Sequence, residues 1–273
     1  MTTIETLESK SKWVRQRVLE MVSHAGHGHI GSSLSCVELL VTLYLAPLLI
    51  YDAQKPDWQE RDRFIMSKGH AAEALYAVLA AAGYFSESTL AWYGEPGCPL
   101  GGEPSHHVAG VEVIGGSLGH GLNIGAGMAL AARMDGQDWR TVVMLGDAEC
   151  YEGSVWEAAM FASHHGLNNL IGIIDRNHLA ILGGTEKILR LEPLTEKWQA
   201  FGWRVMRLDG HDPDEIIQRW EFATYPSNRP TMLIADTVKG KGISFMENDP
   251  QWHHGVPKGE QLEIARKELG LGA

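Results

Sequence analysis

The chain is poor in cysteine, and its cysteines lack the spacing of a disulfide framework or a zinc site. The 273 residues contain three, Cys36, Cys98 and Cys150, with no Cys-X-X-Cys pair and no cysteine–histidine ligand spacing. A disulfide-stabilised fold and a structural zinc site are therefore not expected. We expect a reducing compartment, namely the cytoplasm.

Basic charge and long apolar runs are also missing. Lysine and arginine number 23 against 34 acidic residues, which gives a net charge of −11 and argues against a polyanionic partner. No apolar run approaches the roughly 20 residues that a membrane-spanning helix needs. The first 22 residues have the mixed charge of a helix and contain no apolar signal region. We expect a soluble protein that binds neither nucleic acid nor membrane.

No internal repeat, low-complexity tract or linker divides the sequence, so residues 1–273 are expected to form a single domain. Short apolar runs alternate with amphipathic segments, which predicts an α/β fold whose parallel sheet carries helices on both faces. The expected strands are 64–66, 142–145, 170–174, 203–208 and 231–235. The expected helices are 7–22, 35–49, 71–82, 117–133, 154–165, 213–223 and 258–268.

Two polar side chains follow neighbouring strands of this sheet. Asp147 comes after the strand 142–145, and Asn177 comes after the strand 170–174, with the helix 154–165 between them. In such a βαβ unit the strands are parallel, so both residues reach the ligand-binding edge of the sheet. Their hard oxygen donors suit Mg²⁺, or Ca²⁺ or Mn²⁺ in its place. Taken alone, Asp147 could equally cap the helix that follows.

The stretch from Gly146 to Asn177, GDAECYEGSVWEAAMFASHHGLNNLIGIIDRN, resembles the fingerprint of thiamine diphosphate enzymes. The resemblance implies that Asp147, Asn177 and the backbone carbonyl of Leu179 bind Mg²⁺, which in turn carries the cofactor's diphosphate. A dication is needed because an acidic protein cannot otherwise neutralise two adjacent phosphates. The resemblance also implies cofactor contacts along the start of this stretch, at Gly146, Asp147, Ala148 and Glu149. Ala148 stands where the family pattern has glycine.

Three further segments are similar to transketolase motifs and occur in the family's order. They are Gly28–Ser35, which contains His29, the segment Ser67-Lys68-Gly69-His70, and the turn Gly116–Gly121, and His254-Gly255 follows near the end of the chain. The chain thus resembles the diphosphate-binding half of transketolase over about residues 10–260. The resemblance implies catalytic roles for His29, His70 and His254. It also implies cofactor contacts from His70, Gly116, Ser117, Leu118 and His254.

The same resemblance implies that His29 and His254 contact the substrate, and one departure bears on that contact. Where the family has a Gly-His-Pro histidine that contacts the donor sugar, this chain has Gly102-Glu103-Pro104. An ionised carboxylate only accepts hydrogen bonds and repels phosphate. Either Glu103 binds the donor differently, or His106 or His107 takes over the contact.

The family's pyrimidine-binding half has no counterpart in these 273 residues. The resemblance therefore implies a C-terminal transketolase subunit on a separate chain, a heterotetramer, and transfer of a two-carbon ketol unit from a ketose, expected to be phosphorylated, to an aldose. Two alternatives stay open. One is another thiamine diphosphate enzyme, similar to deoxyxylulose-phosphate synthase or to the E1 component of a 2-oxo acid dehydrogenase. The other is a cofactor-binding module without catalysis.

Overall fold

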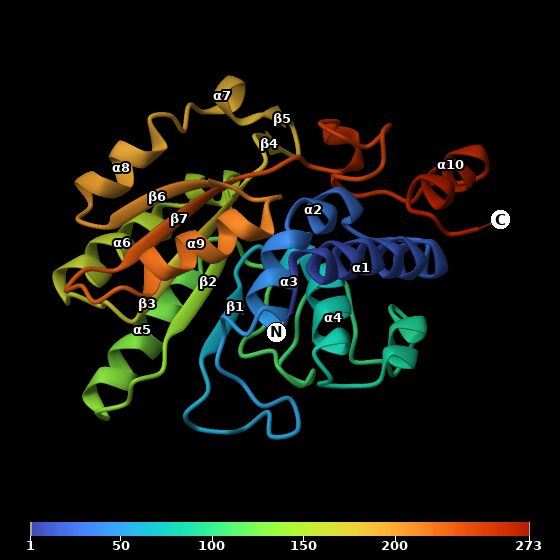
Figure 1. Cartoon of the computed structure of the whole chain (residues 1–273). Coiled ribbons are helices and arrows are strands. Elements are labelled where there is room, and N and C mark those ends of the chain that lie inside the picture. The colour runs from blue at the N-terminus through green and yellow to red at the C-terminus, as the bar shows by residue number, and fades with distance from the viewer. Residues whose placement is uncertain (1, 273) are drawn as a thin grey trace.

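A five-stranded parallel sheet forms the centre of the computed structural model, which describes residues 2–272 (Figure 1). Its strand order is β1-β2-β3-β7-β6, and every neighbouring pair is parallel. The strands are β1 (Arg63–Met66), β2 (Thr141–Gly146), β3 (Leu170–Arg176), β6 (Arg204–Asp209) and β7 (Thr231–Asp236). The predicted sheet is thus confirmed, and its strands begin and end within two residues of the expected bounds.

Helices cover both faces of this sheet, as the alternation of apolar runs predicted (Figure 1). Val142 and Met144 of β2 join one core cluster, whereas Val143 and Leu145 join the other, because successive side chains of a strand point to opposite faces. The first cluster contains residues from α1 (Ile4–Ala25), α2 (Ile30–Ser35), α3 (Val37–Leu45), α4 (Ala72–Ala81), α9 (Pro213–Thr224) and α10 (Glu260–Glu268). The second contains residues from α5 (Gly121–Met134), α6 (Gly153–His164) and α8 (Leu194–Ala200).

Helix α5 packs closely on the sheet because glycine removes side chains from its contact face. A Cβ atom on Gly125 would lie 2.5 Å from Cγ2 of Val143. The expected helix 117–133 begins only at Gly121, since Gly119 adopts a φ of +83° that does not fit a right-handed helix.

Other boundaries also differ from expectation. The helix expected over 35–49 corresponds to α3, which begins at Val37 and ends at Leu45, and the short helix α2 before it was not predicted. The small antiparallel pair β4 (Leu179–Ala180) and β5 (Gly183–Gly184) was not predicted, and neither were α7 (Thr185–Ile188) and α8. These elements are too short to show a periodic apolar pattern.

None of the helices within residues 2–272 combines the length and the apolar character needed to cross a bilayer. Cys36, Cys98 and Cys150 are free thiols.

Candidate functional site

A cavity of about 460 Å³ lies at the edge of the sheet where the parallel strands end. Four of the contributing loops follow a strand: Lys68 and His70 follow β1, Gly146 to Glu149 end or follow β2, Asn177 and Leu179 follow β3, and Lys239 follows β7. The wall also includes segments that follow helices, with His29 after α1 and Glu103, Gly116 and Leu118 before α5. This is the edge at which open α/β sheets bind ligands. The structure therefore brings together the two motifs that the sequence placed 30 positions apart.

Asp147, Asn177 and Leu179 all line the cavity and offer oxygen atoms there. Oδ2 of Asp147 accepts hydrogen bonds from the backbone N–H of His178 at 2.7 Å and from Nη1 of Arg176 at 2.9 Å. Oδ1 of Asn177 accepts from the N–H of Leu179 at 3.1 Å, and the Leu179 carbonyl accepts from Nζ of Lys239 at 3.3 Å. The Asp147 carboxylate, the Asn177 amide and the Leu179 carbonyl thus lie together where β2 and β3 end.

The backbone between these residues is unusual. His178 has a φ of +66°, a left-handed conformation that is rare for residues other than glycine. Its N–H contact with Asp147 holds the loop in this conformation. Ala148 also lines the cavity and lies outside the left-handed region, so the alanine found in place of the family's glycine causes no backbone strain.

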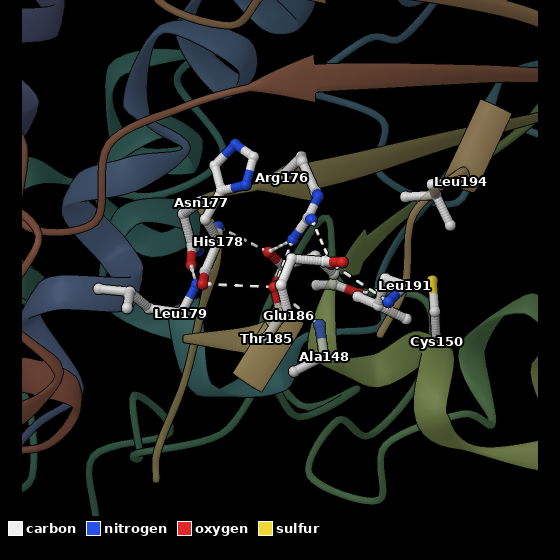
Figure 2. A network of polar contacts seen from close by, with 12 residues as sticks. Ala148, Cys150, Arg176, Asn177, His178, Leu179, Thr185, Glu186, Leu191 and Leu194 are labelled. Atoms are coloured by element: carbon white, nitrogen blue, oxygen red, sulfur yellow. Dashed lines mark hydrogen bonds and ion pairs between the residues drawn. The ribbon is translucent and has the colours of Figure 1, made fainter. Parts of the chain in front are cut away.

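Arg176 anchors this loop from behind, and no sequence pattern had pointed to it. Its side chain is fully buried and donates to Asp147, to Oγ1 of Thr185 at 2.7 Å and to Oε1 of Glu186 at 2.9 Å. Figure 2 shows the guanidinium group between the Asn177–Leu179 loop and the segment that carries Thr185 and Glu186. A charge buried this deeply requires such pairing. Through these contacts Arg176 connects α7 with Asp147, the candidate metal ligand.

A second buried ion pair anchors the loop that carries His70. Lys68 contacts Asp175, and both side chains are at most 1% exposed. Ser35 and Thr237 also donate to the Asp175 carboxylate. Burial alone would raise the pKa of Asp175, but the adjacent Lys68 ammonium group lowers it below its ordinary value.

Lys239 is a buried cation of the cavity wall that has no acidic ion-pair partner among residues 2–272. Burial, followed by repulsion from Lys68, lowers its pKa to about 8. Its Nζ atom lies 3.0 Å from Nδ1 of His253 and donates to the Leu179 carbonyl. An ammonium group without a carboxylate, next to the candidate metal ligands, suits an anionic ligand such as a phosphate.

Four histidines cluster together, and three of them, His29, His70 and His253, line the cavity. The ring of His29 lies 5.7 Å from that of His70, 5.5 Å from that of His253 and 4.8 Å from that of His254, measured between ring centroids. Burial lowers the pKa of His29, that of His70 further, and that of His253 to about 3. These three imidazoles are therefore neutral near pH 7 and can both donate and accept a hydrogen bond.

The cavity wall contains His253 rather than its predicted neighbour His254, which lies against His29. Gly116 and Leu118 line the cavity as expected, whereas Ser117 lines a separate hollow beside His120. His106 and His107, the suggested substitutes for the missing family histidine, pack on each other outside the cavity.

Glu149 and Glu73 are buried carboxyl groups that hold cavity loops in place. Glu149 accepts from the backbone N–H groups of Gly119 at 2.8 Å and of Gly146 at 3.0 Å, which joins the glycine turn to the end of β2. Glu73, which no sequence pattern had indicated, accepts from the N–H of His29 at 2.9 Å. These three hydrogen bonds fix the backbone of the cavity loops, and the one to Glu73 leaves the His29 ring free for a ligand.

Residues 8–273 match the family described as transketolase, thiamine diphosphate binding domain. The chain belongs to this family. This match and the fold of solved transketolases confirm three expectations from the sequence. They are the resemblance to the transketolase family, the thiamine diphosphate-binding α/β fold and the thiamine diphosphate cofactor.

Relatives of similar length are named as transketolase subunits. The chain is 46% identical over 266 residues to one subunit of the apulose-4-phosphate transketolase of Phocaeicola vulgatus, with 97% of this chain and 94% of the relative covered. It is 42% identical over 267 residues to a 6-deoxy-6-sulfo-D-fructose transketolase subunit of a Clostridium species, with 96% of both covered. Both names agree with the prediction of an N-terminal subunit of the transketolase type.

Solved transketolases share the fold but are much longer. The transketolase of Campylobacter jejuni superposes with a TM-score of 0.92 at 30% identity, and the match covers 98% of this chain but 43% of that one. The chain thus spans less than half of a single-chain transketolase.

Proposed function

We propose that this transketolase-family chain supplies the diphosphate-binding half of a transferase that moves a two-carbon ketol unit from a ketose to an aldose. The observation that carries the proposal is the convergence of Asp147, Asn177 and the Leu179 carbonyl with Lys239 and neutral histidines in a single cavity. The names of the relatives of similar length support the transketolase reaction and a phosphorylated sugar substrate.

The donor set fits a magnesium–diphosphate group. No group of three histidine, cysteine or acidic side chains within residues 2–272 could hold a metal. Mg²⁺, however, commonly takes a few protein oxygens together with phosphate oxygens, which matches Asp147, Asn177 and the Leu179 carbonyl. Ca²⁺ or Mn²⁺ could replace it.

The remaining residues of the wall suit the cofactor's tail. Lys239 would pair with the diphosphate, and the backbone of Gly116, Leu118 and Ala148 allows its close approach. Gly146, Glu149 and His70 line the same cavity and would also contact the cofactor. Cofactor contacts of Ser117 and His254, which do not line this cavity, stay predictions. Thiamine diphosphate, when bound, supplies the electron sink for cleavage of the carbon–carbon bond next to a ketose carbonyl.

The histidines act on the sugar in this proposal. His29 and His70 are neutral, so each can donate to a carbonyl or hydroxyl oxygen through one ring nitrogen and accept a proton through the other. Contacts of His254 and Glu103 with the donor substrate belong to the same proposal. Glu73 fixes the backbone of His29 and thereby aims its ring.

A C-terminal subunit with the pyrimidine-binding domain completes the enzyme in this proposal. Apolar side chains are exposed at the cavity mouth, where Leu182 is 84% and Ile181 62% exposed, and both line the cavity. Exposed apolar groups at a site opening are typical of a surface that another chain covers. Relatives of similar length are named as one subunit of a transketolase, which supports a partner chain. The heterotetramer is part of the same proposal. The single-domain organisation of residues 1–273 and a cytoplasmic location stay predictions.

Reconstitution tests the proposal. The purified chain is expected to be inactive alone and to transfer ketol units once a C-terminal transketolase subunit, thiamine diphosphate and Mg²⁺ are added. Phosphorylated ketoses, including apulose 4-phosphate, serve as donors, a labelled aldose serves as acceptor, and the labelled ketose that is two carbons longer is detected by mass spectrometry. Product formation from pyruvate or another 2-oxo acid, without ketol transfer, would favour one of the other thiamine diphosphate reactions. Cofactor binding by an inactive complex would indicate a non-catalytic module.

A further inference from the structure

Glu103 presents a carboxyl group to the cavity with one oxygen that lacks a hydrogen-bond partner. Oε2 of Glu103 is buried and has no donor among residues 2–272, although the residue lines the same cavity as His29 and His70. The backbone of Glu103 is held in place, because its carbonyl accepts from the Tyr76 hydroxyl at 2.8 Å. An unpaired buried oxygen is costly, so its presence on a ligand-binding wall indicates a group that pairs with a ligand.

The fold makes room for this carboxyl group beside His70. A methyl group on Gly69 would overlap Oε2 of Glu103, and a Cβ atom on Gly116 would lie 3.5 Å from its Cγ. The distance at Gly116 is an ordinary van der Waals contact, so it is Gly69 that makes room for the carboxyl group. Glycine at position 69 lets this group lie against the backbone of the loop that carries His70.

The groups around Glu103 favour its protonated form. Burial, followed by the nearby Glu73 carboxylate, raises the pKa of Glu103 to about 7. Three donors hold the Glu73 carboxylate: the N–H of His29, the Ser33 hydroxyl at 2.7 Å and the Tyr93 hydroxyl at 2.8 Å. No cation pairs with Glu103 in the described part of the chain. The titratable groups close to Glu103 are Glu73 and Tyr76 from α4 and Tyr93 after the 3₁₀ turn 87–92. The same cavity is also lined by His29, Lys68, His70, Lys239 and His253.

We propose that Glu103 binds the donor substrate as a neutral carboxylic acid, which donates a hydrogen bond to an uncharged hydroxyl group and accepts one from it. The inference rests on the proposed transketolase function and narrows its substrate class. A neutral acid both donates and accepts, as a hydroxyl group does, whereas an ionised carboxylate only accepts. A substrate anion at this position would be repelled by the nearby Glu73 carboxylate and would find no cation paired with Glu103 among the described residues. The site therefore favours ketoses with a free hydroxyl next to the carbonyl over 2-oxo acids.

The pH dependence of donor binding tests the inference in the reconstituted enzyme. The wild-type KM for the donor ketose is expected to rise between about pH 6 and about pH 8 as Glu103 ionises. Glu103→Gln keeps a donor and an acceptor at every pH, so its KM should not change with pH in this range. Glu103→Ala should raise KM roughly three- to tenfold at the acid end of the range, which is the worth of a typical hydrogen bond. Glu87→Gln, on the exposed 3₁₀ turn 87–92, is the matched control and should behave as wild type.

Two outcomes would overturn the inference while leaving ketol transfer established. One is that the KM of Glu103→Gln rises with pH as much as the KM of wild type does. The other is a wild-type KM in Glu103→Ala. If the wild-type complex transfers no ketol unit, the proposed function itself fails.

Infrared spectroscopy of the full chain gives a readout that does not depend on turnover. A carboxylic acid C=O band should be present in mildly acidic buffer and should disappear as the pH rises through about 7. The band should be missing from Glu103→Gln and unchanged in Glu87→Gln. A band that titrates near the ordinary pKa of glutamate would contradict the inference.

Discussion

Replacement of Lys68 by methionine should destabilise the chain strongly, because it leaves a buried carboxylate without its cation. The Lys68 and Asp175 side chains are 1% and 0% exposed. In the variant, Asp175 keeps the hydroxyl donors of Ser35 and Thr237 but loses its ion pair. Removal of one partner from a buried pair typically costs about 3–5 kcal/mol. We expect a loss in this range in the free energy of unfolding.

Equilibrium denaturation followed by circular dichroism measures this loss. Lys55→Met is the matched control, because Lys55 is 76% exposed and lies 3.7 Å from Asp52 at the surface. An exposed pair of this kind contributes at most about 1 kcal/mol. If Lys68→Met costs no more than Lys55→Met, the assignment of Lys68 and Asp175 as a structural anchor is wrong.

The pH dependence of the same measurement gives a second check. Lys68 lowers the pKa of Asp175 below its ordinary value despite burial, so the ionised carboxylate stabilises the folded state above that ordinary value. This contribution is lost as the pH falls through the lowered pKa. The difference between wild type and Lys68→Met should therefore shrink in strong acid. A difference that stays constant would show that the ion pair does not cause it.

Further predictions concern the glycine turn and the thiols. Gly119→Ala should cost about 1–3 kcal/mol of stability, because Gly119 has a φ of +83° and an added Cβ would lie 2.6 Å from a neighbouring side chain. Gly127→Ala, where nothing lies within 4 Å of the added atom, should be neutral or stabilising in the same thermal unfolding assay. Of the three cysteines, the half-buried Cys98 should react first with a thiol reagent. Burial raises the pKa of Cys36 to about 12 and that of Cys150 well above its ordinary value, so labelling of either in the folded chain, detected by mass spectrometry, would contradict the structure.

The sequence was most informative where periodicity and strand ends combine. Two apolar runs and the helix between them placed Asp147 and Asn177 at one edge, and the parallel register of β2 and β3 explains why they meet there. The buried faces of the strands left a clear apolar signal. The short elements between Leu179 and Ala200 lack such a signal, and the prediction failed there.

The cations of the site were harder to predict. Lys239 comes three residues after β7, so the argument that identified Asp147 after β2 could have identified it too. Arg176 ends a buried strand, and its pairing with Asp147 and Glu186 depends on contacts between loops that periodicity does not reveal. The place of His253 on the cavity wall likewise depends on the path of its loop, which no local pattern specifies.

Calorimetric titration of the full chain with thiamine diphosphate tests the central claim most directly. Binding should require Mg²⁺ and disappear with a chelator. Asp147→Ala and Asn177→Ala should each weaken it by about tenfold or more. Asp138→Ala and Asn228→Ala, two exposed positions outside the cavity, should leave it unchanged. Magnesium-dependent binding that survives in both Asp147→Ala and Asn177→Ala would contradict the account.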